Sequence, residues 1–138
     1  MTRTEPAASP VPVRMWQIGA VAQRTELSIR TIRHYEEVGL VRPSGRSEGG
    51  FRLYTEPDID RLFLIRRMKP LGFSLEEMTD LLAAADAHRD SPDDTTAAEL
   101  DRFLGLATER RESLALQLSR ADDFIAELRR AQSSHGRA

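Results

Sequence analysis

Apolar side chains recur three or four positions apart along most of the chain, which is typical of amphipathic helices. The first such segments predict a short helix over residues 18–23 and a second helix over residues 28–38. Ser28 is a good N-cap for the second helix because its hydroxyl can accept a free backbone N–H, and Gly39 ends that helix. Two short helices joined by a tight turn form a helix-turn-helix. The inner side of its second helix is predicted to comprise Ile29, Ile32 and Val38.

After this pair of helices the pattern changes to alternating apolar and polar residues, as in a half-buried strand. Gly49 and Gly50 mark a tight turn between two candidate strands, residues 44–46 and 51–54. The segment is therefore predicted to be a β-hairpin that forms a wing beside the helix-turn-helix. Its alternation assigns an inner face to Phe51 and Leu53 and an outer face to Arg52 and Tyr54.

Helical spacing returns after the hairpin and predicts a third helix over residues 55–69, which Pro70 and Gly72 end. Ser74 and Glu77 have the spacing of a capping box, so a fourth helix opens there. The polar stretch that follows, residues 85–95, reads as a linker.

Residues 96–132 carry apolar or small side chains in alternating steps of four and three, with Arg111 at the one seam position that breaks the series. This heptad pattern is typical of a coiled coil. Its apolar stripe is too narrow for the helix to fold alone, and the earlier helices are assigned to the first domain. A second copy, packed antiparallel, is the predicted partner. The predicted dimerisation residues are Leu100, Leu104, Ala107, Leu114, Leu118, Ala121, Ile125 and Leu128.

Charge is distributed unevenly, although the net charge of the chain is only −2. Residues 1–72 contain 12 basic and 8 acidic side chains, a net of +4, whereas residues 73–138 contain 8 basic and 14 acidic, a net of −6. Such asymmetry suggests that the first half meets a polyanion and that the second half has a different task.

Several function classes find no support in the composition. The chain has no cysteine, which excludes disulfides, thiolate metal sites and cysteine nucleophiles. His88 lies among aspartates, but a lone histidine in a solvated loop is a better interpretation than a metal site. No nucleophile–base pair or phosphate-binding loop is present, so the sequence predicts neither an enzyme nor a cofactor or metal. The chain also lacks an apolar run long enough to span a membrane or to act as a signal peptide, which predicts a cytoplasmic protein with tails at residues 1–14 and 133–138.

The stretch LSIRTIRHYEEVGLVRP, residues 27–43, leaves two interpretations open. Its arginines and its histidine can form the solvated face of an ordinary amphipathic helix. The same face can instead lie against phosphates and bases.

Three motifs favour the second interpretation: IGAVAQRTELSIRTIRHYEEVGL, GGFRLYTEPDIDRL and IRRMKPLGFSLEEMTDLL. In this order and at this spacing they resemble the MerR family of winged-helix transcriptional regulators, over residues 15–82. The resemblance implies a mostly α fold, with a winged helix-turn-helix over residues 15–84 followed by an antiparallel coiled-coil dimerisation helix. It further implies a homodimer that binds a palindromic promoter operator in double-stranded DNA and distorts it so that RNA polymerase engages the promoter.

The resemblance also implies roles for individual residues. Arg30 and Thr31 would face base edges or nearby phosphates, Arg33 and Tyr35 would clamp the backbone, and the wing would add further phosphate contacts. The implied DNA-binding residues are Ser28, Arg30, Thr31, Arg33, His34, Tyr35, Arg46, Gly50, Arg52 and Tyr54.

Three departures from the family pattern stand out. Glu26 occupies a turn position that is often glycine, His34 replaces the first tyrosine of a usual pair, and Pro70 is expected to shorten the third helix.

Without cysteine, sensing of thiophilic metals or through an iron–sulfur cluster is excluded. A small ligand at the dimer interface, a protein partner and no effector at all stay open. An architectural DNA-binding protein without effector or promoter switch is the alternative function.

Overall fold

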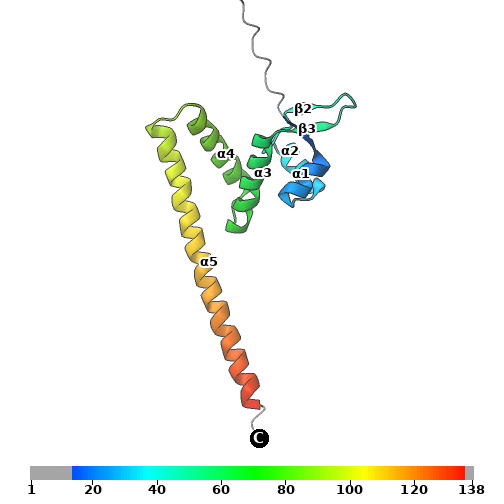
Figure 1. Ribbon diagram of the computed structural model, residues 1–138. Coiled ribbons are helices and arrows are strands. Elements are labelled where there is room, and N and C mark those ends of the chain that lie inside the picture. Colours follow the sequence, from blue (N-terminus) through cyan, green and yellow to red (C-terminus); the bar gives the residue numbers. More distant parts are fainter. Residues whose placement is uncertain (1–13, 136–138) are drawn as a thin grey trace, which may run out of the picture. The chain divides into compact units, whose positions relative to one another are not determined.

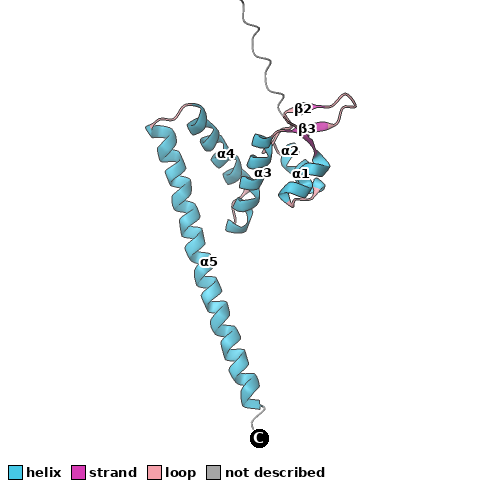
Figure 2. Ribbon diagram, viewed as in Figure 1, coloured by secondary structure: helices cyan, strands magenta, loops and turns pink. Residues whose placement is uncertain are grey.

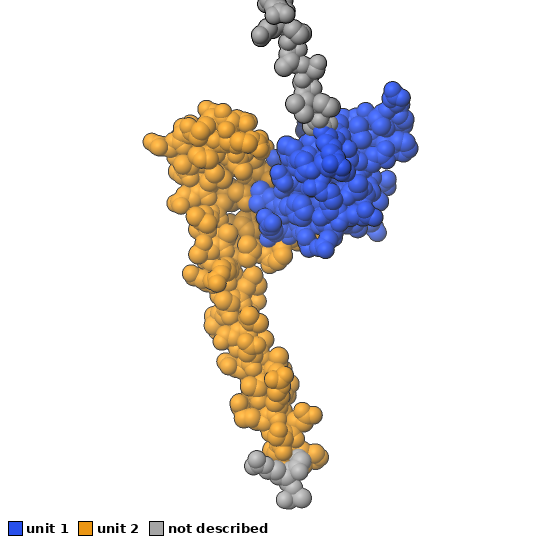
Figure 3. All heavy atoms as spheres, in the orientation of Figure 1, with its two compact units in different colours: residues 1–67 blue, residues 68–138 orange. Residues whose placement is uncertain are grey.

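The computed structural model describes residues 14–135, and the chain divides into two compact units, residues 1–67 and 68–138 (Figure 3). The described residues are mostly helical, with one small sheet and a long final helix (Figure 2), as the sequence predicted. Most of the two predicted tails lies outside the described residues, and residues 133–135 continue the last helix. In chain order the elements are β1 (Trp16–Gln17), α1 (Ile18–Thr25), α2 (Ile29–Glu37), β2 (Gly45–Arg46), β3 (Arg52–Tyr54), α3 (Glu56–Met68), a 3-10 turn η1 (Lys69–Leu71), α4 (Leu75–Asp90) and α5 (Asp94–His135) (Figure 1).

The helix-turn-helix of the first unit is formed by α1 and α2. Between them Glu26 adopts the left-handed conformation, with φ of 58°, which costs a residue other than glycine roughly 1 kcal/mol. The turn is therefore retained despite the missing glycine, and the Glu26 carboxylate pairs with Arg66 at 2.7 Å. The Ser28 cap is confirmed, since the backbone N–H of Thr31 donates to its hydroxyl at 3.0 Å.

The sheet has three antiparallel strands in the order β1-β3-β2. The predicted hairpin supplies β2 and β3, and β1 pairs with the other edge of β3, so that Trp16 lies opposite Tyr54. The wing is thus tied directly to the start of α1.

The core of the first unit corrects the predicted faces of two elements. On α2, Ile29 and Val38 are about two-fifths exposed, whereas Tyr35 is only 4% exposed. On the hairpin, Phe51 is 63% exposed and Tyr54 is fully buried, the reverse of the predicted alternation. The fully buried side chains of this unit are Val21, Thr25, Ile32, Leu40, Val41, Tyr54, Ile59, Leu62 and Ile65.

The second unit begins where α3 ends. Pro70 lies in the 3-10 turn η1 rather than in α3, as its lack of a backbone N–H predicts, and Gly72 closes the turn with φ of 73°. The capping box is confirmed, because Glu77 and Ser74 each accept the other's backbone N–H. Two hydrogen bonds lower the pKa of the Glu77 carboxyl. The larger effect comes from the backbone N–H of Ser74, and the next from the guanidinium of Arg110, which donates at 2.7 Å.

The predicted linker over residues 85–95 is wrong at both ends. Helix α4 continues to Asp90, because its alanine-rich end favours helix, and α5 begins at Asp94, so residues 91–93 alone connect them. Asp93 caps α5 by accepting the backbone N–H of Thr96 at 2.7 Å. His88 does not lie in a solvated loop either, since its Nδ1 is 2.8 Å from the Thr96 hydroxyl.

Helix α4 packs against the first part of α5, which corrects the expectation that no helix of this chain was available as a partner. The residues buried there are Met78, Leu82, Ala84 and Phe103. Beyond residue 110, by contrast, α5 has no buried residue within its described length.

Candidate nucleic-acid interface

One face of α2 presents polar side chains to solvent. Arg30, Arg33, His34 and Glu37 are all exposed, on the side of the helix opposite the buried Ile32. Thr31 is half-buried, and its hydroxyl accepts a hydrogen bond from Ser28 at 2.8 Å. Ser28 and Thr31 therefore shape the start of α2, and the arginines and His34 make its outward surface.

Beside this face lies a cleft with a strongly cationic wall. Arginines from α2, β2 and β3 contribute three positive charges to it, and α1 begins at its edge. Gln17, the N-cap of α1, makes no side-chain cap hydrogen bond, and the start of a helix carries partial positive charge. The cleft is lined by Gln17, Ile18, Arg33, Arg46, Gly50, Phe51 and Arg52.

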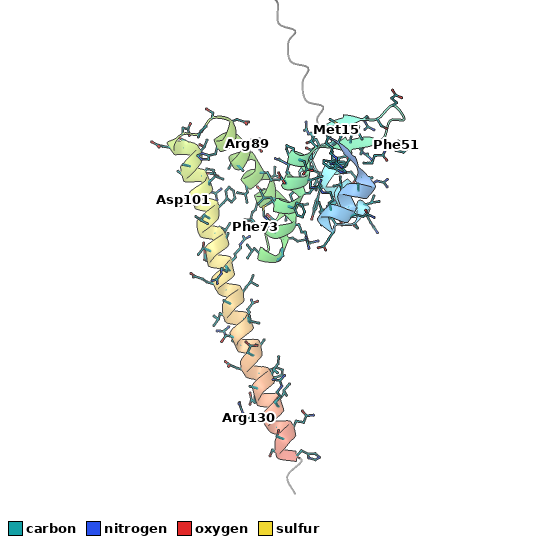
Figure 4. All side chains as sticks on the ribbon, in the orientation of Figure 1. Met15, Phe51, Phe73, Arg89, Asp101 and Arg130 are labelled. Atoms are coloured by element: carbon teal, nitrogen blue, oxygen red, sulfur yellow. The ribbon has the colours of Figure 1, made fainter. Side chains whose placement is uncertain are left out.

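The hairpin tip is held by a glycine and an arginine side chain. Gly50 has φ of 79°, a conformation that suits glycine, and the guanidinium of Arg46 donates to the carbonyl of Gly50 at 3.0 Å. The ring of Phe51 lies over Gly49, where an added Cβ would meet it at 3.1 Å. The tip therefore presents Phe51 outward (Figure 4), and Phe51 lines the same cleft as the three arginines.

A carboxylate from α2 joins two residues of β3. Arg52 donates through Nε to one oxygen of Glu36 at 2.7 Å, and the hydroxyl of Tyr54 donates to the other oxygen at 3.1 Å. Burial, and then the negative charge of Glu36, raise the pKa of Tyr54 to about 12. Tyr54 is neutral at physiological pH, and its hydroxyl donates to Glu36.

The structure brings together most of the predicted DNA-binding residues and removes two from the surface. Arg33, Arg46, Gly50 and Arg52 line the cleft, and Arg30 and His34 lie on the exposed face of α2. Tyr35 and Tyr54 instead belong to the core, since they are only 4% and 0% exposed.

Sequence reasoning missed four residues at this surface: Gln17, Ile18, Glu36 and Phe51. The pairing of β1 with β3 brings Gln17 and Ile18 to this surface, and no local sequence pattern predicts that pairing. Glu36 could have been suspected from its phase on α2, between the buried and the exposed sides. Phe51 precedes β3, so the alternation of that strand does not apply to it.

The predicted dimerisation residues fall into two groups. Leu100 and Ala107 are half-buried in the part of α5 that packs on α4, whereas Leu104 is 64% exposed. Past this region the remaining seam residues form an exposed stripe of Leu114, Leu118, Ala121, Ile125 and Leu128. Two further exposed apolar residues of α5, Leu116 and Phe124, were not predicted.

Metal and membrane chemistry gain no support from residues 14–135. Within that range no three acidic or histidine side chains gather as a metal site would require. None of the helices in the same range is both long and apolar enough to cross a bilayer.

Comparison with known proteins agrees with this geometry. Residues 16–85 match the family profile described as MerR HTH family regulatory protein, and residues 59–131 match the profile described as MerR, DNA binding. The HTH-type transcriptional regulator ZntR of Escherichia coli is 36% identical over 116 residues, which cover 84% of this chain and 77% of ZntR.

Two solved structures are similar as well. A MerR-family transcriptional regulator from Bacillus cereus has a TM-score of 0.61 at 29% identity, covering 83% of this chain and 78% of that one. HiNmlR, a MerR-family regulator lacking the sensor domain and bound to promoter DNA, has a TM-score of 0.67 at 26% identity, covering 80% of each chain. These relatives are transcriptional regulators and not enzymes. The chain belongs to the MerR family and is a DNA-binding transcriptional regulator.

Proposed function

We propose that this regulator binds a palindromic promoter operator as a homodimer, with α2 in the major groove and the hairpin on the phosphate backbone. The observation that carries the proposal is the cleft, where three arginines from separate elements converge beside the exposed face of α2. Arginine binds phosphate in a fixed, bidentate geometry, so such convergence suits a DNA backbone.

A division of labour follows from where the side chains lie. Arg30 is near the start of α2, the end of a recognition helix that usually reaches base edges. Arg33, Arg46 and Arg52 line the cleft and contact phosphates, which positions the protein without reading sequence. His34, on the same exposed face, donates to the backbone.

The homodimer is supported by the stripe of exposed apolar side chains on α5. A contiguous apolar surface on a single helix is costly in water and favours a partner. Ala121 lies midway between Leu114 and Leu128, the two ends of this exposed stripe, so two antiparallel copies would place Leu114 of one chain near Leu128 of the other. Such a pairing gives a dimer with twofold symmetry. A dimer of this symmetry binds a palindromic site, because each copy contacts an identical half-site.

Transcription changes, in this proposal, because the bound dimer distorts the promoter and RNA polymerase then engages it differently. A promoter-bound protein acts in the cytoplasm of its host. With no cysteine in the chain, an effector, if one is used, is a small molecule or a protein rather than a thiolate-bound metal.

Genome-wide footprinting of the tagged chain in its host tests the proposal. Discrete protected sites at promoters are expected for the wild type, and Arg33→Ala should weaken all of them. Arg120→Ala, which removes the same charge from an exposed position on α5, is the matched control and should leave the sites occupied. Protection that spreads along the DNA without preferred sites would instead indicate an architectural protein and would overturn the promoter switch.

A further inference from the structure

We infer that Glu36 is a positioning residue for DNA binding: it fixes the guanidinium of Arg52 so that its outer edge meets one backbone phosphate. The inference rests on the proposed function, because it assumes that the cleft receives DNA. It concerns an acidic residue, which charge alone would exclude from a phosphate-binding surface.

The guanidinium of Arg52 has two hydrogen-bonding edges, and Glu36 uses only one of them. Its Nε donates to Glu36 at 2.7 Å, which occupies the edge of the guanidinium nearest the helix. The two terminal nitrogens take no part in that bond, and together they form a second edge of the guanidinium. Since Arg52 lines the cleft, these nitrogens provide the paired donors that a phosphate accepts.

Glu36 can hold Arg52 because Glu36 is itself held. Its second oxygen accepts the hydroxyl of Tyr54, whose ring is fully buried. The Glu36 side chain is only 17% exposed, against 37% for Arg52. A fixed path therefore runs from the core through Tyr54 and Glu36 to a cation at the surface.

Two physical effects of Glu36 on DNA binding oppose each other. Its negative charge stands next to a group that binds a phosphate, so charge alone predicts tighter binding when Glu36 is removed. Its hydrogen bond restrains a long side chain that would otherwise lose freedom on binding. If restraint dominates, removal weakens binding by roughly three- to tenfold for each half-site, which is the range expected for one immobilised side chain.

The sign of the effect is measured with the full-length chain and a defined probe. The probe is the duplex that the wild-type protein selects from a random pool, and the measurement is its dissociation constant by fluorescence anisotropy. Because the duplex holds two copies of the chain, Glu36→Ala is expected to bind it roughly ten- to a hundredfold more weakly. Glu48→Ala, which removes the same charge from the exposed hairpin turn, is the matched control and should bind as tightly as the wild type or more tightly. Tighter binding by Glu36→Ala would overturn the inference.

A second comparison distinguishes positioning from a general loss of structure. In an Arg52→Ala background, Glu36→Ala should cause no further weakening, because the residue it positions is gone. Equal weakening in both backgrounds would show a structural role and overturn the inference. Should Glu36→Ala fail to fold, as judged by its thermal melt, Glu36→Gln replaces it in the same cycle. Because Gln keeps the shape and one acceptor, its loss should be smaller than the loss expected for Ala, and it should disappear in the Arg52→Ala background.

The phosphate itself supplies the final readout. Replacing the two symmetry-related phosphates of the half-sites by neutral methylphosphonates, one pair at a time, should reveal one pair of positions at which wild type and Glu36→Ala bind equally, because the contacts that Glu36 organises are then absent. A difference that persists at every position would contradict the inference. A wild-type chain that selects no duplex at all would instead refute the proposed function, so the two failures are distinguishable.

Discussion

Leu114 and Leu116 offer a matched pair of substitutions on α5 that tests how two copies of the chain meet. Both are leucines on the same exposed helix, with exposed fractions of 42% and 52%. Two residues of α-helix correspond to about 200° of rotation, so Leu114 lies on the apolar stripe and Leu116 on nearly the opposite side. We predict that Leu114→Ala weakens the dimer and that Leu116→Ala does not.

The magnitude follows from the exposed fraction of Leu114. Truncating leucine to alanine removes about 2.4 kcal/mol of burial free energy, at roughly 0.8 kcal/mol for each carbon group. Only the exposed two-fifths of Leu114 is left for a second copy to cover, which leaves about 1 kcal/mol per chain. A symmetric dimer loses this twice, or about 2 kcal/mol, which corresponds to a dissociation constant raised roughly 30-fold.

Sedimentation equilibrium over a series of concentrations measures this constant for the wild type and both variants. Thermal melts at high concentration check that α4 and the first part of α5 remain packed. A Leu116→Ala variant that dissociated as readily as Leu114→Ala would refute the assignment of the stripe. The same conclusion would follow if neither variant changed the dissociation constant.

Three further predictions concern single residues. Arg33→Ala should weaken binding to all duplexes alike and lower the slope of log affinity against log salt by about two units, one for each copy in the dimer, whereas Arg30→Ala should relax discrimination at one base position of each half-site in selections from a random pool. Because burial and Glu36 raise the pKa of Tyr54 to about 12 in the folded chain, against about 10 unfolded, the stabilisation by its neutral phenol is complete below pH 10 and is lost as the pH rises towards 12. Urea titrations across that range should show a smaller decline for Tyr54→Phe than for the wild type. Ser74→Ala removes the cap of α4 and should cost about 1 kcal/mol of unfolding free energy, measured by urea denaturation.

The features that the sequence predicted correctly are those that local chemistry decides. Ser28 and Ser74 cap their helices because a hydroxyl and a free backbone N–H are neighbours in any fold. Pro70 ends α3 for an equally local reason, the missing N–H. Gly50 turns the hairpin because it takes a positive φ without strain.

The features that it missed depend on partners far away in the chain. Tyr54 is buried because a carboxylate 18 residues earlier accepts its hydroxyl, and a rule that places polar groups outside cannot anticipate this. Phe103 belongs to a core that α4 completes, and the heptad count overlooked it because it falls between seam positions. In both cases a residue's environment was assigned from its own element alone.

Two copies of this chain should bind one DNA site through identical surfaces. Selection from a random duplex pool is the direct test of this symmetry. Purified full-length chain is incubated with the pool, bound duplexes are recovered and sequenced over several rounds, and the enriched motif is examined for symmetry. Two identical surfaces should select an inverted repeat whose half-sites lie about one helical turn, or a multiple of it, apart on one face of the DNA. An enriched motif without twofold symmetry, or no enrichment over the starting pool, would contradict it.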